Sequence, residues 1–413
     1  MASVRKRGNS YQITVSNGRD LTGKQLIETA TFTPDPQRTD KQNQKALEKF
    51  IFEFEEKVKS GKFLDGEKLT FSKFTEKWLN EYAAVQLERT TVDIYKILLS
   101  VHILPVIGHL KLARIQPVHL NSMYNDMLYT RKDGKEGGYS PTTIKRVHAL
   151  ISSILSTAVR WNILLENPCE RVQPPKQTRS ADNIKYFTLE QSEAFLGALE
   201  HDYNAGTIRL QHVLFFQMAL FCGLRRGELI ALTWEDINME KGIVSVTKST
   251  SIVNGKPYTK APKNKSSNRA VSLPASVLQL AKQYRKEQIK YRLSIGSQWD
   301  GDNYIFIQWN GRQMYPSTPY STFKDIINRY NSRTEDSSQF LPDIPLHGLR
   351  HTSATLLISQ NIDIRTVSGR LGHAQTSTTM NIYSHALQKM DEKAADTLEG
   401  LFHTKPDHTL VKC

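Results

Sequence analysis

Apolar and polar positions alternate with the period of a β-strand in the first 65 residues. The apolar positions are Tyr11, Ile13, Val15, Ile27 and Phe32, and Asn17-Gly18 is typical of a tight turn between strands. The pattern predicts a small antiparallel sheet. Residues 40–59 follow a helical period instead, with Leu47, Phe50, Phe54 and Val58 on one face. We expect this helix to pack on the sheet, and the glycines after it to end the first domain at about residue 65.

Residues 69–172 carry helical periods throughout, which predicts a compact helical domain. Three apolar stripes recur at helical spacing: Phe71, Phe74, Trp78 and Tyr82; Val92, Tyr95 and Leu99; and Leu120, Met123, Tyr124 and Met127. The clearest helix begins at Ser140-Pro141, because serine is a preferred N-cap and proline suits the first helical position. We expect it to end before Asn167-Pro168.

Residues 173–185 lack apolar periodicity and contain two adjacent prolines, as expected of an extended linker. The third domain, residues 186–413, begins with a capping box from Thr188 to Gln191. A buried helix ending near Cys222 follows, then basic strands around Asn254-Gly255, and helices again near Pro274 and Leu346. The pattern therefore predicts a multidomain α+β fold, in which the third domain is mainly helical and contains a small antiparallel sheet.

Length and composition exclude several classes of protein. A chain of 413 residues, 39% apolar and 23% charged, is typical of a globular protein of two or three domains. The most apolar run, residues 213–222, is half the roughly 20 residues that a bilayer requires. No apolar segment follows the basic N-terminus, so we expect no secretory signal and a cytoplasmic protein. Three scattered cysteines are too few for a disulfide framework.

The charge balance points to a polyanionic partner. The chain has 55 Lys and Arg against 41 Asp and Glu, a formal net charge of +14, and nucleic acid is the leading candidate for such a partner. The excess is uneven, because residues 241–286 contain ten Lys or Arg and no acidic residue. We expect this stretch to lie against phosphates.

Two motifs in the third domain present arginine at fixed positions. GLRRGE, residues 223–228, places Arg225 at the start of a short helix, and LHGLRH, residues 346–351, places His347 and Arg350 three apart on one helix face. Each motif alone is equally typical of a capped or buried helix, but a guanidinium fork also suits phosphate oxygens. A zinc site on His347 and His351 is not expected, because Arg350 would repel a cation.

The motifs are more specific together than apart. GLRRGE, LHGLRH, LGH at residues 371–373 and a tyrosine ten residues later, with basic strands between the first two, resemble the signature of tyrosine recombinases, the phage-integrase family. The catalytic resemblance covers about residues 185–401. The helical domain before it resembles the family's core-site DNA-binding domain. The basic N-terminal sheet resembles the arm-site-binding domain of integrases from phages and conjugative transposons.

By motif position, the resemblance implies the catalytic residues Arg225, Lys263, His347, Arg350, His373 and Tyr383. For the lysine, both Lys263 and Lys265 precede an arginine and a strand, as in the family's hairpin, and the spacing to Val271 and Leu273 favours Lys263. Ser272 stands where the family often has proline. The resemblance implies no cofactor and no metal.

The same resemblance implies a division of labour. Tyr383 would attack the scissile phosphate and form a 3′-phosphotyrosyl intermediate, while the two arginines stabilise the charge of the transition state. His347 is the candidate base, His373 donates a hydrogen bond to the phosphate, and the lysine protonates the departing 5′ oxygen. Because the phosphotyrosyl link retains the bond energy, rejoining needs neither ATP nor metal.

The implied function is site-specific recombination that integrates and excises a mobile element. The implied partners are double-stranded DNA, a homotetramer in the synaptic complex, and accessory DNA-bending or excision proteins. We expect an apolar stripe of the C-terminal tail to dock on a neighbouring subunit, through Leu387, Met390, Ala394, Leu398 and Leu401. Two alternatives are a type IB topoisomerase-like enzyme, which shares the chemistry, and a non-catalytic DNA-binding regulator on the same fold, which would lack active-site residues.

Overall fold

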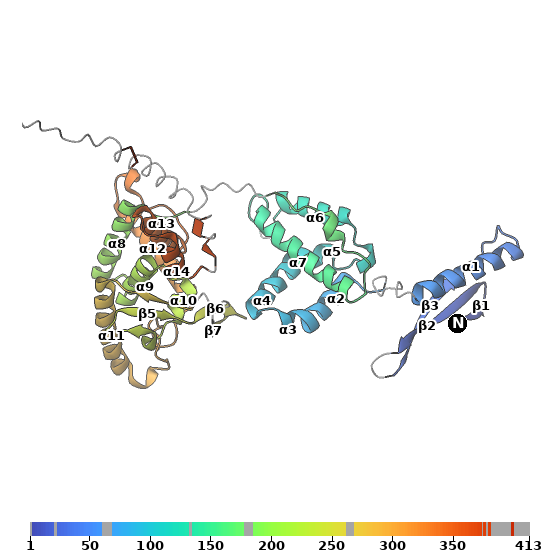
Figure 1. The fold of residues 1–413 in the computed structure, drawn as a ribbon, viewed down its shortest axis with the longest axis horizontal. Coiled ribbons are helices and arrows are strands. Elements are labelled where there is room, and N and C mark those ends of the chain that lie inside the picture. The colour runs from blue at the N-terminus through green and yellow to red at the C-terminus, as the bar shows by residue number, and fades with distance from the viewer. Residues whose placement is uncertain are drawn as a thin grey trace, which may run out of the picture. The chain divides into compact units, whose positions relative to one another are not determined.

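The computed structural model describes residues 2–19, 23–59, 68–131, 134–176, 185–261 and 268–373, together with residues 375–376, 379–380 and 398–399. Two compact units make up the chain, Met1–Thr178 and Arg179–Cys413, and each is described by itself (Figure 1). The first unit holds a sheet with one helix, followed by a group of helices. The second unit is mainly helical with short strands.

The N-terminal sheet has three antiparallel strands in the order β1 (Ser3–Arg7), β2 (Ser10–Arg19) and β3 (Gln25–Phe32), and α1 (Asp40–Lys59) packs on it (Figure 1). Ile13 and Val15 of β2 are buried against Phe54 and Val58 of α1. The predicted alternation in β2 and the predicted helix are therefore confirmed, since both elements bury one apolar face against the other.

One expectation about this sheet is wrong, and the burial of β3 follows from strand register. Asn17-Gly18 does not form the hairpin turn but lies within β2, where the pairing with β3 shifts between Ser16 and Arg19. Ile27 is 57% exposed, whereas its neighbour Glu28 is buried and accepts a hydrogen bond from Lys68 at 2.6 Å. The reason is register: Val15 pairs with Glu28, so Glu28 shares the buried face and Ile27 points to the other.

The helical part of the first unit buries the three predicted stripes in one core. Its elements are α2 (Phe71–Trp78), η2 (Leu79–Ala83), α3 (Ala84–Gln86), α4 (Arg89–Leu98), η3 (Leu99–Ile103), α5 (Leu104–Ile107), η4 (Leu112–Arg114), α6 (Pro117–Tyr129), α7 (Pro141–Arg160) and η5 (Pro168–Arg171). Ser140 caps α7 as expected, because its hydroxyl accepts from the Thr143 amide. Trp78 is fully buried and donates to Thr157 Oγ1 at 3.2 Å, which ties α2 to α7.

One helical stretch among the described residues, Arg89–Ile107, is long and apolar enough to cross a membrane by length and composition. Its apolar side chains Leu98, Leu99, Ile103 and Ile107 are buried in the core of the helical group. Only part of the stretch is buried, since Ile94 and Ile97 are 53% and 60% exposed.

The second unit is built around α9 (Leu210–Cys222), a helix that is buried on nearly all sides. The other helices are α8 (Leu189–Asn204), α10 (Arg226–Ala231), η7 (Trp234–Asp236), α11 (Ala275–Ile295), η9 (Gly296–Gln298), α12 (Thr318–Arg333), η10 (Ser337–Gln339), α13 (Gly348–Ser359) and α14 (Ile364–Leu371). The strands are β4 (Ile237–Asn238), β5 (Ile243–Val246), β6 (Ser249–Val253), β7 (Lys256–Lys260) and β8 (Arg269–Ser272). They form an antiparallel sheet in the order β4-β5-β8 and a separate β6-β7 hairpin.

These elements confirm the multidomain α+β fold class. The Thr188 capping box and the Asn254-Gly255 hairpin turn are where the sequence predicts them. Helix α12 was not predicted, although Phe323, Ile326 and Ile327 bury one of its faces. The predicted linker lies mostly outside the described residues, and the roles of the domains stay predictions.

A buried carboxylate joins α8 to α12. Asp202 is fully buried and accepts from Arg329 Nε at 2.8 Å and from Arg333 Nη1 at 3.0 Å. Burial alone would raise the pKa of Asp202, but the hydrogen bonds from the two arginines bring it below its usual range. The carboxylate is therefore charged at neutral pH and fixes the two helices.

Asp202→Ala should lower the free energy of unfolding of this unit by about 1–3 kcal/mol, because it strips two arginines of their buried acceptor. Denaturant unfolding measures the change. Asp300 serves as the matched control, since its ion pair with Arg312 is exposed, and Asp300→Ala should stay within about 0.5 kcal/mol of the parent. Equal losses from the two variants would contradict a structural role for Asp202.

Candidate active site

The first predicted arginine lies where α9 ends and α10 begins. Gly223 terminates α9 in the left-handed conformation, with φ of 62°, and Arg225 is the N-cap residue of α10. A Cβ atom on Gly223 would lie 2.6 Å from Leu371 Cδ2, so only glycine fits this turn. The backbone thus fixes where the Arg225 side chain starts, and 36% of that side chain is exposed.

Glu228 binds both the backbone and the side chain of Arg225. Its carboxylate accepts from the Arg225 amide at 2.9 Å, which caps α10, and from Arg225 Nη1 at 2.8 Å, which forms an ion pair. The Glu228 side chain is only 4% exposed. Burial opposes its charge, yet hydrogen bonds from Arg269 and Arg225 lower the pKa of Glu228 below its usual range. The buried group is therefore an anion.

The second predicted arginine, Arg350 on α13, is 2% exposed. Its two terminal nitrogens donate to the carbonyl oxygens of Gly223 and Leu371, both at 2.6 Å. The side chain therefore bridges the end of α9 and the end of α14.

Three arginines converge on the C-terminus of α14. Arg269 Nε donates to the carbonyl of Arg370 at 2.7 Å, Arg350 to that of Leu371, and Arg225 Nη2 to that of Gly372 at 3.2 Å. The last carbonyls of a helix have no partner within the helix and carry its negative dipole end. Three consecutive carbonyls of α14 are thus satisfied by three cations from distant parts of the sequence.

The two predicted histidines flank these arginines. His347 is the N-cap of α13, and its ring meets the His351 ring edge-on, with 4.9 Å between centroids. Desolvation and the charges of Arg350 and Arg225 lower the pKa of His347 to about 4. His373 follows Gly372, and its Nδ1 lies 2.8 Å from the Thr379 hydroxyl. The same causes lower the pKa of His373 to about 4, so both rings are neutral at pH 7.

Part of this arrangement lines a hollow of about 430 Å³. Arg225, His347, Gly227 and Tyr320 are among the residues that line it. A cation and a neutral imidazole on one wall suit an anionic ligand that exchanges a proton.

Four of the six predicted residues lie together: Arg225, His347, Arg350 and His373. Lys263, its alternative Lys265, and the predicted nucleophile Tyr383 are outside the described residues. In the part of the chain that the structure describes, no group of three or more His, Cys, Asp or Glu side chains is placed to hold a metal ion.

Two residues of this arrangement were not predicted as site residues. Glu228 is three positions after Arg225, a capping-box spacing that could have signalled the contact, but the sequence gives no sign that it is buried. Arg269 contacts Glu228 across 41 positions of sequence. Only the fold brings these two together.

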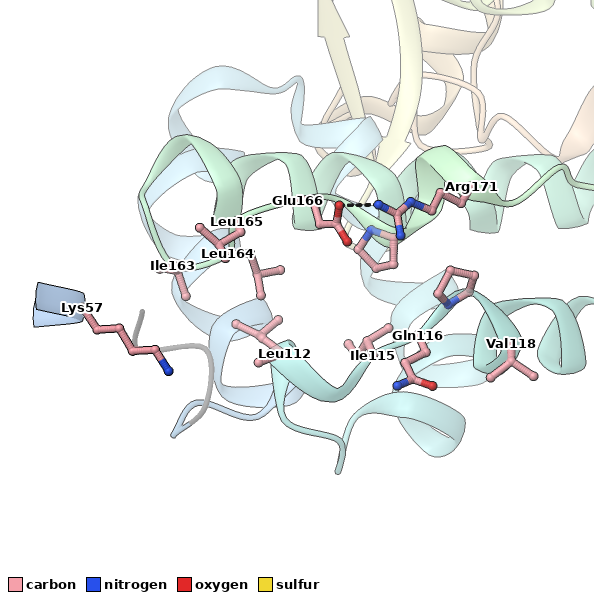
Figure 2. Close-up of a pocket in the computed structure, with 13 residues that line it drawn as sticks. Lys57, Leu112, Ile115, Gln116, Val118, Ile163, Leu164, Leu165, Glu166 and Arg171 are labelled. Atoms are coloured by element: carbon pink, nitrogen blue, oxygen red, sulfur yellow. Dashed lines mark hydrogen bonds and ion pairs between the residues drawn. The ribbon is translucent and has the colours of Figure 1, made fainter. Parts of the chain in front are cut away.

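A larger hollow of about 770 Å³ lies elsewhere, in the helical part of the first unit (Figure 2). Leu112, Ile115 and Leu164 make much of its wall apolar. Its charged residues Glu166 and Arg171 bind each other, with 2.6 Å from Arg171 Nη2 to Glu166 Oε2. This hollow lacks the convergent cations of the first site, so we do not treat it as the active site.

Comparison with known proteins finds two matching family models and several relatives. Residues 185–390 match the phage integrase family, and residues 70–128 match the phage integrase N-terminal SAM-like domain. The tyrosine recombinase XerC-like protein of Caldanaerobacter subterraneus subsp. tengcongensis is 28% identical over 95% of this chain and 96% of its own length. The ICEBs1 integrase of Bacillus subtilis is 32% identical over 66% of this chain and 69% of its own length.

Solved structures share the fold. The Tn1549 transposon integrase, in complex with a circular intermediate DNA, aligns with a TM-score of 0.62 and 19% identity over 78% of this chain and 99% of the other. A lambda integrase dimer bound to a COC′ core site aligns with a TM-score of 0.55 and 16% identity over 92% of this chain and 94% of the other. The two family matches and the Bacillus subtilis relative show that the chain belongs to the phage integrase family and is a tyrosine-type site-specific recombinase.

Proposed function

We propose that this recombinase integrates and excises a mobile DNA element, and that the arginine and histidine cluster at the end of α14 is its phosphate site. The observation that carries the proposal is the convergence of Arg225 and Arg350, beside His347 and His373, on the consecutive backbone carbonyls of Gly372 and Leu371. Similarity to the ICEBs1 integrase and to the Tn1549 transposon integrase supports a mobile element as the source of the DNA.

In this proposal, Arg225 and Arg350 bind the nonbridging oxygens of the scissile phosphate. Attack on a phosphodiester concentrates negative charge on those oxygens, and preorganised donors in a partly buried site stabilise it without reorganising. A guanidinium presents its N–H donors in a planar fork that suits phosphate oxygens. The same carbonyl contacts hold each guanidinium in place before DNA arrives.

The histidines exchange or share protons with the reacting groups. A pKa of about 4 leaves His347 neutral at pH 7, which is the state in which it can accept the proton of the nucleophile. Nδ1 of His373 pairs with the Thr379 hydroxyl. In the tautomer that carries its proton on Nε2, that nitrogen donates to a phosphate oxygen.

The nucleophile of the proposal is Tyr383, ten residues after His373, and the proton donor to the 5′ oxygen is Lys263, with Lys265 as the alternative. Tyrosine titrates near pH 10, so its hydroxyl needs a base or a cationic field as it attacks. A 3′-phosphotyrosyl link would then preserve the bond energy for rejoining. Binding and chemistry thus require no cofactor.

The domain roles complete the proposal. Residues 1–65 bind arm sites, residues 69–172 bind the core site, and residues 186–413 catalyse, joined by the linker 173–185. Recombination joins two duplexes, so we propose a homotetramer in the synaptic complex, assisted by accessory DNA-bending or excision proteins, in the cytoplasm. The C-terminal stripe, of which the structure describes Leu398, would dock on a neighbouring subunit.

A type IB topoisomerase-like enzyme is the second candidate, since it uses the same chemistry. It needs no partner duplex, so recombination of two marked DNA sites separates the two functions. A relaxed plasmid without exchanged markers would favour the topoisomerase.

Tyr383→Phe should abolish the covalent adduct on a nicked duplex that spans the end of the element encoding the chain, because only the attacking hydroxyl is lost. Affinity for the duplex should stay within about twofold, since phosphate contacts elsewhere supply most of the binding. Denaturing gels and binding titrations measure the two quantities. Tyr330→Phe, on core helix α12, is the matched control and should retain the adduct; an adduct of normal yield from Tyr383→Phe would reject the assignment.

The neutral histidines predict how stability depends on pH. Folding lowers the pKa values of His347 and His373 from 6.5 to about 4. Between pH 4 and pH 6.5 the unfolded chain therefore binds more protons than the folded chain. The free energy of unfolding should therefore be highest above pH 6.5 and fall as the pH drops toward 4. Urea titrations of the DNA-free protein at several pH values measure this. A double variant, His347→Gln with His373→Gln, should show a shallower fall, and an unchanged slope would contradict the neutral state.

Removal of residues 1–65 should leave core-duplex binding and cleavage intact but prevent recombination with arm-containing DNA. The apolar core of the sheet and α1 is formed by its own residues, and the helical core begins after residue 68. Gel shifts with core and arm duplexes measure the effect. A truncated chain that folds, as judged by circular dichroism, yet binds no core duplex would overturn the domain roles.

A further inference from the structure

Arg269 is buried beside the proposed phosphate site but has no role in the chemistry described so far. It is the first residue of β8, its side chain is 6% exposed, and its guanidinium engages the Glu228 carboxylate with two nitrogens. The distances are 3.1 Å from Nη1 to Oε1 and 2.8 Å from Nη2 to Oε2. This is the bidentate geometry in which an arginine fixes a carboxylate most firmly.

The same side chain is fixed at its other end. Arg269 Nε donates to the carbonyl of Arg370 at 2.7 Å. A Cβ atom at Gly372 would lie 2.9 Å from Arg269 Nη1, so the backbone that leads into His373 is packed directly on the guanidinium. Arg269 therefore connects β8, the start of α10 and the end of α14.

Charge gives this arrangement a second consequence. Arg225 and Glu228 alone would form a neutral pair, in which the carboxylate attracts the guanidinium away from a phosphate. Arg269 takes a share of the carboxylate and adds a positive charge. The three side chains together therefore keep one positive charge in excess, on the side where Arg225 is exposed.

We propose that Arg269 is a positioning residue that clamps Glu228 and thereby holds Arg225 in the orientation and charge state that bind the scissile phosphate. The inference rests on the proposed function of Arg225. Arg269 does not touch the DNA in this proposal, and it acts through Glu228 and through the backbone beside His373.

Arg269→Met should slow adduct formation at saturating DNA by about 100-fold, since a displacement of about 1 Å at a reacting centre costs that much. The affinity for the duplex should change little. Single-turnover cleavage of the nicked element-end duplex by the full-length protein measures the rate. Arg312→Met removes an exposed arginine of the same unit and should cleave at the parent rate. Parent-rate cleavage by Arg269→Met would overturn the clamp.

A second variant separates the clamp from simple misfolding. Glu228→Gln combined with Arg269→Met leaves no unpaired buried charge, so this double variant should fold with a cooperative thermal transition and still cleave slowly. A double variant that cleaves at the parent rate would show that the clamp is not needed.

The substrate offers a readout that a purely structural role would not move. A methylphosphonate at the scissile position lacks one negative oxygen and depends less on arginine charge. The defect of Arg269→Met should therefore shrink on this duplex, in parallel with that of Arg225→Lys. An equal defect on both duplexes would reject action through Arg225.

A measurement without DNA keeps the inference separate from the proposed function. The NMR signals of the Arg225 guanidinium are assigned in the free protein by their loss in Arg225→Lys. They should show restricted rotation of the guanidinium in the parent and averaged rotation in Arg269→Met. Unchanged restriction would overturn the clamp. If the parent forms no adduct, the proposed function fails, and these signals still decide whether the clamp exists.

Discussion

A guanidinium that is to meet a phosphate must be held still in a partly dry site, and a buried cation is costly unless acceptors surround it. This constraint organises the second unit. The C-terminal carbonyls of α14 and the carboxylate of Glu228 supply the acceptors for Arg225, Arg269 and Arg350. The end of α9, the start of α10, α13 and β8 all have to meet at α14 for these contacts to form. The apolar core around α9 provides the rigid support.

One electrostatic field then serves two purposes. Burial disfavours protonation of His347 and His373, and the charges of Arg350 and Arg225 add to that effect, so both imidazoles stay neutral. Reciprocal contacts stiffen the assembly further, because the Arg370 side chain donates back to the carbonyl of Phe221 near the end of α9. Orientation and protonation state are therefore consequences of the same packing.

Much of this was readable in the sequence, where local signals decide the outcome. Ser140 and Thr188 mark helix starts because a hydroxyl at that position has one preferred partner. Ile27 and Glu28 show the limit of prediction from local sequence. Strand register determines which of these two neighbours is buried, and register depends on pairing across the sheet. Glu228 and Arg269 show the same limit in the site. The motif places Arg225 and Glu228, but Arg269, which binds Glu228, lies on a strand 41 positions after Glu228.

The two left-handed glycines at the ends of α9 and α14 have a consequence for how this sequence can vary. Both glycines have positive φ, and a side chain would press on Leu371 at Gly223 and on the Arg269 guanidinium at Gly372. Neither glycine carries a functional group. Variants at these positions would nonetheless be lost from a library selected for activity as completely as variants of the arginines. Intolerance to substitution therefore marks residues that support the site as well as residues that carry its chemistry. Intolerance alone does not identify the residues that touch DNA.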